Sequence, residues 1–258
     1  MVDLSLEGQV AIVTGGSKGI GRAIAKTFAA AGASVAIAAR GVEELEGTAA
    51  AIEAEGGRCL ALPTDVTDPD QVQVLVDRTV QEFGTVDILV NNAGAAPFMS
   101  TLDQIRLDGF EKYFRVNFFS AVYCTRAVGP VLTAKGSGCV LNIASVSGLV
   151  ASPGLSYYST AKSALIGLTR TTAREWAGFG VRVNALAPGW IETEMNEGAR
   201  QNKAFVITTT RSIPLGRWGK PEEVAGAGLF LCSPAASWIT GTVLLMDGGQ
   251  LLGSMLGV

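Results

Sequence analysis

The sequence contains no histidine among its 258 residues. This absence excludes Ser-His-Asp triads, Cys-His pairs and metal sites built from imidazole ligands. Proton transfer by this chain must therefore use tyrosine, lysine or carboxylate side chains.

Cysteine is scarce and scattered. The four cysteines are Cys59, Cys124, Cys139 and Cys232, and none belongs to a C-x-x-C pair or a zinc-type spacing. Isolated thiols suit a reducing compartment, so we expect four small buried side chains. The sequence predicts no metal site.

A basic surface and long apolar runs are also lacking. The net charge is -3 and the pI is about 5.2, so duplex nucleic acid is not an expected partner. No apolar run approaches membrane-spanning length, and the amino terminus has no basic segment followed by an apolar one. We therefore expect a cytoplasmic protein without a membrane partner.

Short apolar runs alternate with helical stretches along the chain. This alternation is typical of an α/β fold, a doubly wound parallel sheet of the Rossmann type with helices on both faces. We expect a single domain over residues 1–258. Strands are expected at 9–14, 34–39, 58–62, 86–90, 139–143, 181–186 and 242–246, and helices at 22–31, 42–55, 69–83, 108–132, 158–179 and from 221.

The segment 190–217 breaks this regularity. It mixes charged and aromatic residues and follows the carboxyl end of an expected strand, where ligands bind in open sheets. We predict a mobile flap over the site. A surface helix pair without a gating role is the alternative.

A phenol and an ammonium stand four residues apart at Tyr158 and Lys162. On a helix this spacing places both on one face, and a cation nearby favours the ionised form of a phenol. Ser145 follows an expected strand upstream, where its hydroxyl can point out at the sheet edge. The three groups could serve as donor, acid/base and cation, although a Tyr/Lys pair alone could be an ordinary surface contact.

A glycine loop lies between the first expected strand and helix. Residues 14–21 read Thr-Gly-Gly-Ser-Lys-Gly-Ile-Gly, a turn that lets a pyrophosphate approach backbone N–H groups at a helix start. Plain turns and methyltransferases use similar loops. The second expected strand ends at Arg40 without an acidic residue, and Lys18 lies inside the loop. These two cations favour the 2′-phosphate of NADP(H) over NAD(H), unless both are solvated surface charges.

With these pieces placed, the chain resembles the short-chain dehydrogenase/reductase family from about residue 6 to residue 249. Each matching motif is weak alone, but their joint order makes coincidence improbable. The matching elements are residues 14–21, Asp65-Val66, Asn91-Asn92-Ala93-Gly94, Asn117, Ser145, Tyr158 with Lys162, Pro188-Gly189 with Thr193, and Asp247-Gly248-Gly249.

The resemblance implies a role for each catalytic position. Tyr158 would be the acid/base, Ser145 would hold the substrate oxygen, and Lys162 would lower the pKa of Tyr158 and bind the nicotinamide ribose. Asn117 would continue a proton relay through water, although its residue type alone suits a helix cap or a core polar group equally well.

The resemblance also implies the contacts with the cofactor. Asp65 and Val66 would flank the adenine, Asn91 and Gly94 would line the cofactor floor, and Ile191 and Thr193 would contact the carboxamide. The expected cofactor-binding set is Gly15, Ser17, Lys18, Gly19, Ile20, Gly21, Arg40, Asp65, Val66, Asn91, Ala93, Gly94, Tyr158, Lys162, Pro188, Gly189, Ile191 and Thr193.

The expected substrate walls are mostly apolar: residues 95–98, Val146, Gly148, Val150 and Trp190. No carboxylate or phosphate clamp is evident, which favours a neutral or weakly polar ketone or secondary alcohol. The segment from Pro214 to Glu223 resembles the 3-oxoacyl-[acyl-carrier-protein] reductases. That activity, sugar or polyol dehydrogenases, steroid-type carbonyl reductases and a non-catalytic NADP(H)-binding sensor stay open as alternatives.

Family members are commonly tetramers, so the resemblance implies a homotetramer. The apolar tail after Gln250, with Leu251, Leu252, Met255, Leu256 and Val258, is expected to be buried against a neighbouring subunit.

Overall fold

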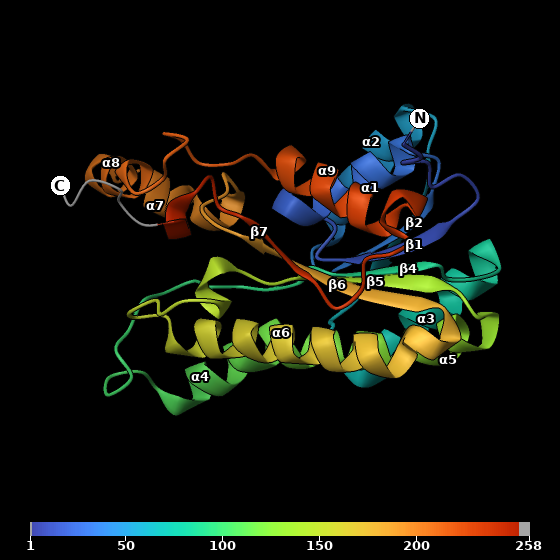
Figure 1. Ribbon diagram of the computed structural model, residues 1–258, viewed down its shortest axis with the longest axis horizontal. Helices are drawn as coiled ribbons and strands as arrows, with labels where there is room; N and C mark the ends of the chain where they lie inside the picture. Colours follow the sequence, from blue (N-terminus) through green and yellow to red (C-terminus); the bar gives the residue numbers. More distant parts are fainter. Residues whose placement is uncertain (1, 253–258) are drawn as a thin grey trace.

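Seven parallel strands form one sheet in the computed structural model, which describes residues 2–252. The strand order is β3-β2-β1-β4-β5-β6-β7, so the chain builds one half of the sheet and then crosses back to build the other (Figure 1). All strands end at the same edge, and the order reverses between β1 and β4, where ligands bind in such sheets. The strands are β1 (Val10–Thr14), β2 (Ser34–Ala39), β3 (Arg58–Pro63), β4 (Ile88–Asn91), β5 (Gly138–Ile143), β6 (Val181–Pro188) and β7 (Val243–Met246).

Helices cover both faces of this sheet, as predicted. In Figure 1, α1, α2 and α9 lie on one face, while α3, α5 and α6 lie on the other. The remaining helices lie near the end of the molecule that holds the strand ends. The helices are α1 (Gly19–Ala30), α2 (Val42–Ala54), α3 (Pro69–Phe83), α4 (Leu107–Phe114), α5 (Ser120–Lys135), α6 (Ser156–Trp176), α7 (Glu197–Arg200), α8 (Lys203–Arg211) and α9 (Pro221–Cys232).

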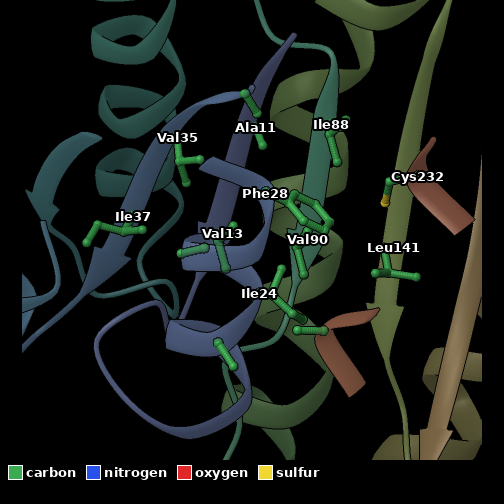
Figure 2. Packing of buried hydrophobic residues seen from close by; sticks show 14 of the residues in the cluster. Ala11, Val13, Ile24, Phe28, Val35, Ile37, Ile88, Val90, Leu141 and Cys232 are labelled. Atoms are coloured by element: carbon green, nitrogen blue, oxygen red, sulfur yellow. The ribbon is translucent and has the colours of Figure 1, made fainter. Parts of the chain in front are cut away.

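The hydrophobic core lies on both sides of β1, which is buried along its whole length. Ile24 and Phe28 of α1 belong to the same buried cluster as Val13 and Val90, as Figure 2 shows. A second cluster lies on the opposite face, around Ile12. Each Å² of apolar surface buried contributes roughly 25 cal/mol, so these clusters hold the strand ends in fixed positions.

Local signals explain why α3 begins and ends where the sequence predicted. The side chain of Asp68 accepts a hydrogen bond of 2.9 Å from the backbone N–H of Asp70, and Pro69 starts the helix. Gly84 ends it with a φ of 85°, a conformation that only glycine adopts readily.

The single helix predicted over residues 108–132 is wrong in one respect. A π-helical stretch, η1 (Arg115–Phe119), lies between α4 and α5. Such a turn adds one residue to the helical repeat and is often found at functional sites, and this one carries Asn117. Nothing in the apolar periodicity marks a local change of this size.

The irregular segment over 190–217 contains short helices, and its role as a flap stays a prediction. It holds the short turn η4 (Glu194–Asn196), followed by α7 and α8. Both helices lie beyond the carboxyl ends of the strands, at the left of Figure 1.

The structure also bears on the expected absence of a membrane span, on the cysteines and on the apolar tail. Within residues 2–252, no helix is both long and apolar enough to cross a bilayer. All four cysteines are free, but Cys59 is only partly buried because its strand, β3, lies at the edge of the sheet. Most of the predicted apolar tail falls on residues 253–258, outside the described residues, and Leu252 is 81% exposed.

Candidate active site

Ser145, Tyr158 and Lys162 meet at the carboxyl end of β5. Ser145 follows that strand, and its hydroxyl accepts a hydrogen bond of 3.1 Å from the N–H of Ser147. Tyr158 and Lys162 lie one turn apart on α6, with the ammonium 5.5 Å from the centre of the phenol ring. The Ser145 hydroxyl is close enough to the Tyr158 phenol to favour its ionised form. The structure therefore brings together the three side chains that the sequence selected.

The pKa values of Tyr158 and Lys162 are both shifted from their ordinary values. Burial raises the pKa of Tyr158 above its ordinary value, and the hydrogen bond with Ser145 only partly opposes this. Lys162 is 3% exposed, and burial lowers its pKa to about 8. Its ammonium donates a hydrogen bond of 2.8 Å to the carbonyl oxygen of Ile143. The expected lowering of the tyrosine pKa by Lys162 stays a prediction, because Lys162 is not among the groups that shift the pKa of Tyr158 in this structure.

Asn117 lies in η1 beside this group. A Cβ placed on Gly94 would be 2.7 Å from the Asn117 Oδ1 and 3.5 Å from the Lys162 Nζ. The amide Nδ2 donates to the carbonyl oxygens of Ala95 at 2.8 Å and Tyr113 at 2.7 Å, while Oδ1 accepts from the Ala95 N–H at 3.1 Å. These bonds give Asn117 a structural role, one of the alternatives that its residue type allowed.

The glycine loop forms a cradle that side chains would fill. Gly15 and Gly19 have φ values of 65° and 50°, and a Cβ on Gly21 would overlap the Gly15 carbonyl oxygen. Helix α1 starts at Gly19 with no acidic residue in its first turn and no side-chain cap on its N–H groups. A pyrophosphate fits such an end, because unpaired N–H groups and the helix dipole attract anions.

Two other loop residues, Ser17 and Ile20, are held by contacts with the rest of the protein. Ser17 is 9% exposed, and its carbonyl oxygen accepts a hydrogen bond from the Thr48 hydroxyl at 3.3 Å. Ile20 packs against the core cluster of the α1 face. Ile20 can therefore contribute to a cofactor site only through its backbone, while a role for the Ser17 hydroxyl stays a prediction.

Thr14 and Asn92 join the glycine loop to β4, and the sequence reasoning did not place either in the site. The Thr14 hydroxyl accepts hydrogen bonds from the N–H groups of Asn92 at 3.0 Å and Ala93 at 3.1 Å. The Asn92 amide donates to the carbonyl oxygens of Thr14 at 2.8 Å and Gly15 at 3.2 Å. A polar residue at the end of an apolar run is the signal that could have found Thr14.

The two predicted phosphate-binding cations, Arg40 and Lys18, differ in their ion pairing. Arg40 is exposed and forms no ion pair with any residue in 2–252. Lys18 pairs with Glu44 of α2 at 2.7 Å, and this partner raises the pKa of Lys18 and has its own pKa lowered. Glu44 therefore places a carboxylate beside the predicted 2′-phosphate position, a residue that the sequence reasoning missed.

Asp65 and Val66 follow β3 at the same edge of the sheet. Asp65 Oδ1 accepts hydrogen bonds from the backbone N–H of Thr67 at 2.9 Å and from its hydroxyl at 2.8 Å. Val66 is 8% exposed and packs in the second core cluster. The pair thus has a fixed local turn in a position that suits the predicted adenine contact.

Asn91 points into the protein. Its Nδ2 donates to the Thr125 hydroxyl at 2.9 Å and to Asn142 Oδ1 at 2.8 Å, and Asn142 in turn donates to Thr169 of α6 at 2.8 Å. This network links β4, β5, α5 and α6. Any contribution of Asn91 to the predicted cofactor floor must therefore come from its backbone.

The segment after β6 closes against the glycine loop. The N–H of Gly189 donates to the Met246 carbonyl oxygen at 2.9 Å, which extends the pairing of β6 with β7 past its last residue, Pro188. A Cβ on Gly19 would lie 3.2 Å from Thr193 Cγ2. Ile191 is 6% exposed and pairs with Gly219 in an isolated bridge, so its side chain belongs to the core. Thr193 is the member of this set that lies closest to the loop.

Three aromatic rings join this segment to α8. Trp190 stacks on Trp218 with ring centres 5.1 Å apart and meets Phe205 edge-on at 5.3 Å. The indole N–H of Trp218 donates to the Thr209 hydroxyl at 3.0 Å. The predicted substrate-wall residue Trp190 thus anchors α8 beside the strand ends.

Two further loops border the site, and they are joined to each other. An isolated bridge pairs Ser100 with Leu155, and the Ser100 N–H donates to the Gly154 carbonyl oxygen at 2.8 Å. Large apolar side chains are exposed on these loops and on the 190–217 segment. They include Met99 at 67%, Leu149 at 41%, Val150 at 44%, Met195 at 53% and Ile207 at 52%.

The described part of the chain holds no cluster of acidic and cysteine side chains that could bind a metal ion. The chemistry available at this site consequently comes from two hydroxyls, one buried ammonium and the backbone of the glycine loop.

Comparisons with known proteins match almost the whole chain to reductases and dehydrogenases. A sequence family described as enoyl-(acyl carrier protein) reductase matches residues 15–250. The chain is 39% identical over 250 residues to a 3-oxoacyl-[acyl-carrier-protein] reductase of Synechocystis sp., covering 96% of this chain and 99% of that one. It is 37% identical over 245 residues to a gluconate 5-dehydrogenase of Gluconobacter oxydans, covering 95% of each. A solved gluconate 5-dehydrogenase from Burkholderia cenocepacia, in complex with NADP and tartrate, matches with a TM-score of 0.93 at 34% identity, covering 98% of this chain and 99% of that one.

Proposed function

The chain belongs to the short-chain dehydrogenase/reductase family, and we propose that it transfers a hydride between NADP(H) and a ketone or secondary alcohol of neutral or weakly polar character. The observation that carries this proposal is the group formed by the Ser145 hydroxyl, the Tyr158 phenol and the buried Lys162 ammonium at the carboxyl end of β5.

The two hydroxyls would act together on the substrate oxygen. The nicotinamide supplies the hydride in reduction and accepts it in oxidation. Tyr158 donates a proton to the carbonyl oxygen as negative charge develops there, and Ser145 donates a hydrogen bond to the same atom. Because the pKa of Tyr158 is raised, the phenol is protonated at neutral pH and ready to act as the acid.

The proposed preference for NADP(H) rests on charge at the end of β2. The exposed Arg40 guanidinium is free to approach a 2′-phosphate, and the Lys18 ammonium of the glycine loop would do so on leaving its ion pair with Glu44. The solved relative from Burkholderia cenocepacia binds NADP, which supports the same choice.

The proposed substrate class rests on the exposed apolar side chains around the site. Met99, Leu149 and Val150 lie on the two joined loops, and Met195 lies on the segment after β6. Apolar groups on opposite sides of a site suit an apolar substrate body with one reactive oxygen.

Reduction of a 3-oxoacyl group on an acidic carrier protein is a second candidate, because the Synechocystis relative carries that name. The surface ahead of β5 offers little to such a carrier. Lys135 is the one basic residue in 134–138, and it already forms an ion pair with Asp87. A free ketone or alcohol is therefore the preferred substrate.

Assays of NADPH and NADH oxidation against ketones, free 3-oxoacyl thioesters, carrier-bound 3-oxoacyl groups and sugars test this proposal. We expect turnover of a neutral ketone, with kcat/KM for NADPH at least about tenfold above that for NADH. Turnover with NADH alone would contradict the cofactor preference. Tight NADPH binding without reduction of any of these compounds would instead favour a sensor.

We also propose a homotetramer, because several large apolar side chains are exposed away from the site. Trp238 is 100% exposed, Phe179 is 53% exposed, and Leu244 and Leu245 on the edge strand β7 are 36% and 37% exposed. Such surfaces are typical of subunit contacts. Light scattering that gives the mass of one chain would contradict this proposal, and cell fractionation would test the expected cytoplasmic location.

A further inference from the structure

Tyr157, the residue before Tyr158, is buried completely, with 0% of its side chain exposed. Its phenol donates a hydrogen bond of 2.8 Å to the carbonyl oxygen of Phe98. Phe98 lies in the loop after β4, which forms one of the expected substrate walls. One hydrogen bond therefore connects the catalytic helix α6 with that wall.

Aromatic contacts surround this hydrogen bond. The ring of Phe98 lies 4.9 Å from that of Tyr157 and meets Tyr113 of α4 edge-on at 5.5 Å. Tyr113 and Tyr157 are 5.7 Å apart. Three rings from a loop and two helices thus pack around the Phe98 position, and such pairs add stability beyond the area they bury.

The loop is held at only a few other points. Asn117 binds the backbone of Ala95 through both amide atoms, and the Ser100 N–H donates to Gly154. Between these ends, the Tyr157 hydroxyl is the side-chain group that fixes the backbone of Phe98.

The loop also borders an open space on the side of α4. A cavity of about 440 Å³ borders it and is lined by residues of the loop and of α4, among them Phe98, Gln104 and Tyr113. Since little atomic contact supports the loop from that side, the loss of the bond from Tyr157 should let Phe98 move.

We propose that Tyr157 is a positioning residue, whose hydroxyl fixes residues 95–100 relative to the adjacent Tyr158 and thereby sets the affinity of the site for its carbonyl substrate. Neither proton transfer nor cofactor binding involves Tyr157. Only the predicted effect on substrate affinity rests on the proposed function. The hydrogen bond between Tyr157 and Phe98 holds the loop to α6 whatever the substrate is.

The Tyr157→Phe variant tests the tie directly, since it keeps the ring and removes the hydroxyl. Tyr123→Phe is the matched control: Tyr123 lies on α5, and its hydroxyl accepts a hydrogen bond of 3.3 Å from Arg115 of η1 instead of binding the loop backbone. Amide hydrogen exchange is measured on both variants without substrate. We expect exchange in 95–106 to become about fivefold faster in Tyr157→Phe, and to stay unchanged in Tyr123→Phe.

The kinetic arm uses ethyl acetoacetate as the probe ketone, with NADPH. In Tyr157→Phe we expect KM to rise about fivefold or more while kcat changes less than about threefold and the NADPH Kd is kept. A fall in melting temperature with unchanged exchange in 95–106 would overturn the proposal, because Tyr157 would then be a core residue only. Faster amide hydrogen exchange in 95–106 with an unchanged KM would overturn the proposed effect of Tyr157 on substrate affinity. If the wild-type protein does not reduce the probe, the proposed function fails on this ketone, while the exchange result still decides whether Tyr157 holds the loop.

Discussion

The Lys162 ammonium lies 2.8 Å from the carbonyl oxygen of Ile143, two residues before Ser145. This contact fastens the catalytic helix α6 to the end of β5. It also places a cation where only 3% of the side chain is exposed, so the charged form is costly and its pKa falls to about 8.

The buried cation makes stability depend on pH. In the folded protein Lys162 has a pKa of about 8, against 10.5 for an ordinary lysine, so between these values the unfolded chain binds more protons. Stability must therefore rise with pH in this window. We expect the free energy of unfolding to increase by about 2 kcal/mol from pH 7 to pH 9.5 in the wild type relative to Lys162→Met. Urea unfolding at both pH values measures this, and parallel changes in the two proteins would contradict the burial of the charge.

Glu44 should oppose NADPH binding, because its carboxylate pairs with Lys18 at 2.7 Å beside the predicted phosphate position. In Glu44→Gln the ammonium is released and a negative charge is removed. We expect the Kd for NADPH to fall about three- to tenfold, with little change for NADH. The control is Glu46→Gln on the same helix, since Glu46 is exposed and forms no ion pair within residues 2–252. Fluorescence titration gives both constants, and equal effects in the two variants would exclude a specific role for Glu44.

Two glycines that look alike in the sequence should respond in opposite ways to alanine. A Cβ on Gly21 would overlap the Gly15 carbonyl oxygen, whereas a Cβ on Gly47 of α2 would meet nothing within 4 Å. Gly47→Ala should add roughly 0.5–1 kcal/mol of stability, the usual gain within a helix. Gly21→Ala should lose about 2 kcal/mol or more and weaken NADPH binding. Urea unfolding of both variants checks this pair, and a neutral Gly21→Ala would contradict the close backbone approach.

The sequence predicts the strands well because parallel strands covered on both faces are continuous apolar runs. The limits of β2 and α3 agree with the predicted ones, since glycine, proline and Asp68 mark them. The same reasoning places Ser145 and Tyr158 together, because a strand end and a helical spacing are local patterns.

Features that depend on contacts between distant segments could not be predicted in this way. The π-helical stretch carries Asn117, which is hydrogen-bonded to Ala95 in a distant loop, and the Lys18–Glu44 pair joins a loop to another helix. Desolvation of Tyr158 likewise depends on how the loops and α6 close over it, which spacing along the chain does not encode.

The central claim is that Tyr158 supplies the proton for carbonyl reduction, and the most direct test is the rate of NADPH oxidation in Tyr158→Phe with a ketone that the wild type reduces. Tyr123→Phe, outside the site, serves as the control. We expect Tyr158→Phe to keep the wild-type Kd for NADPH and to lose turnover by about a thousandfold or more, the scale of a general acid. Turnover within about tenfold of the wild type, with NADPH still bound, would contradict the account.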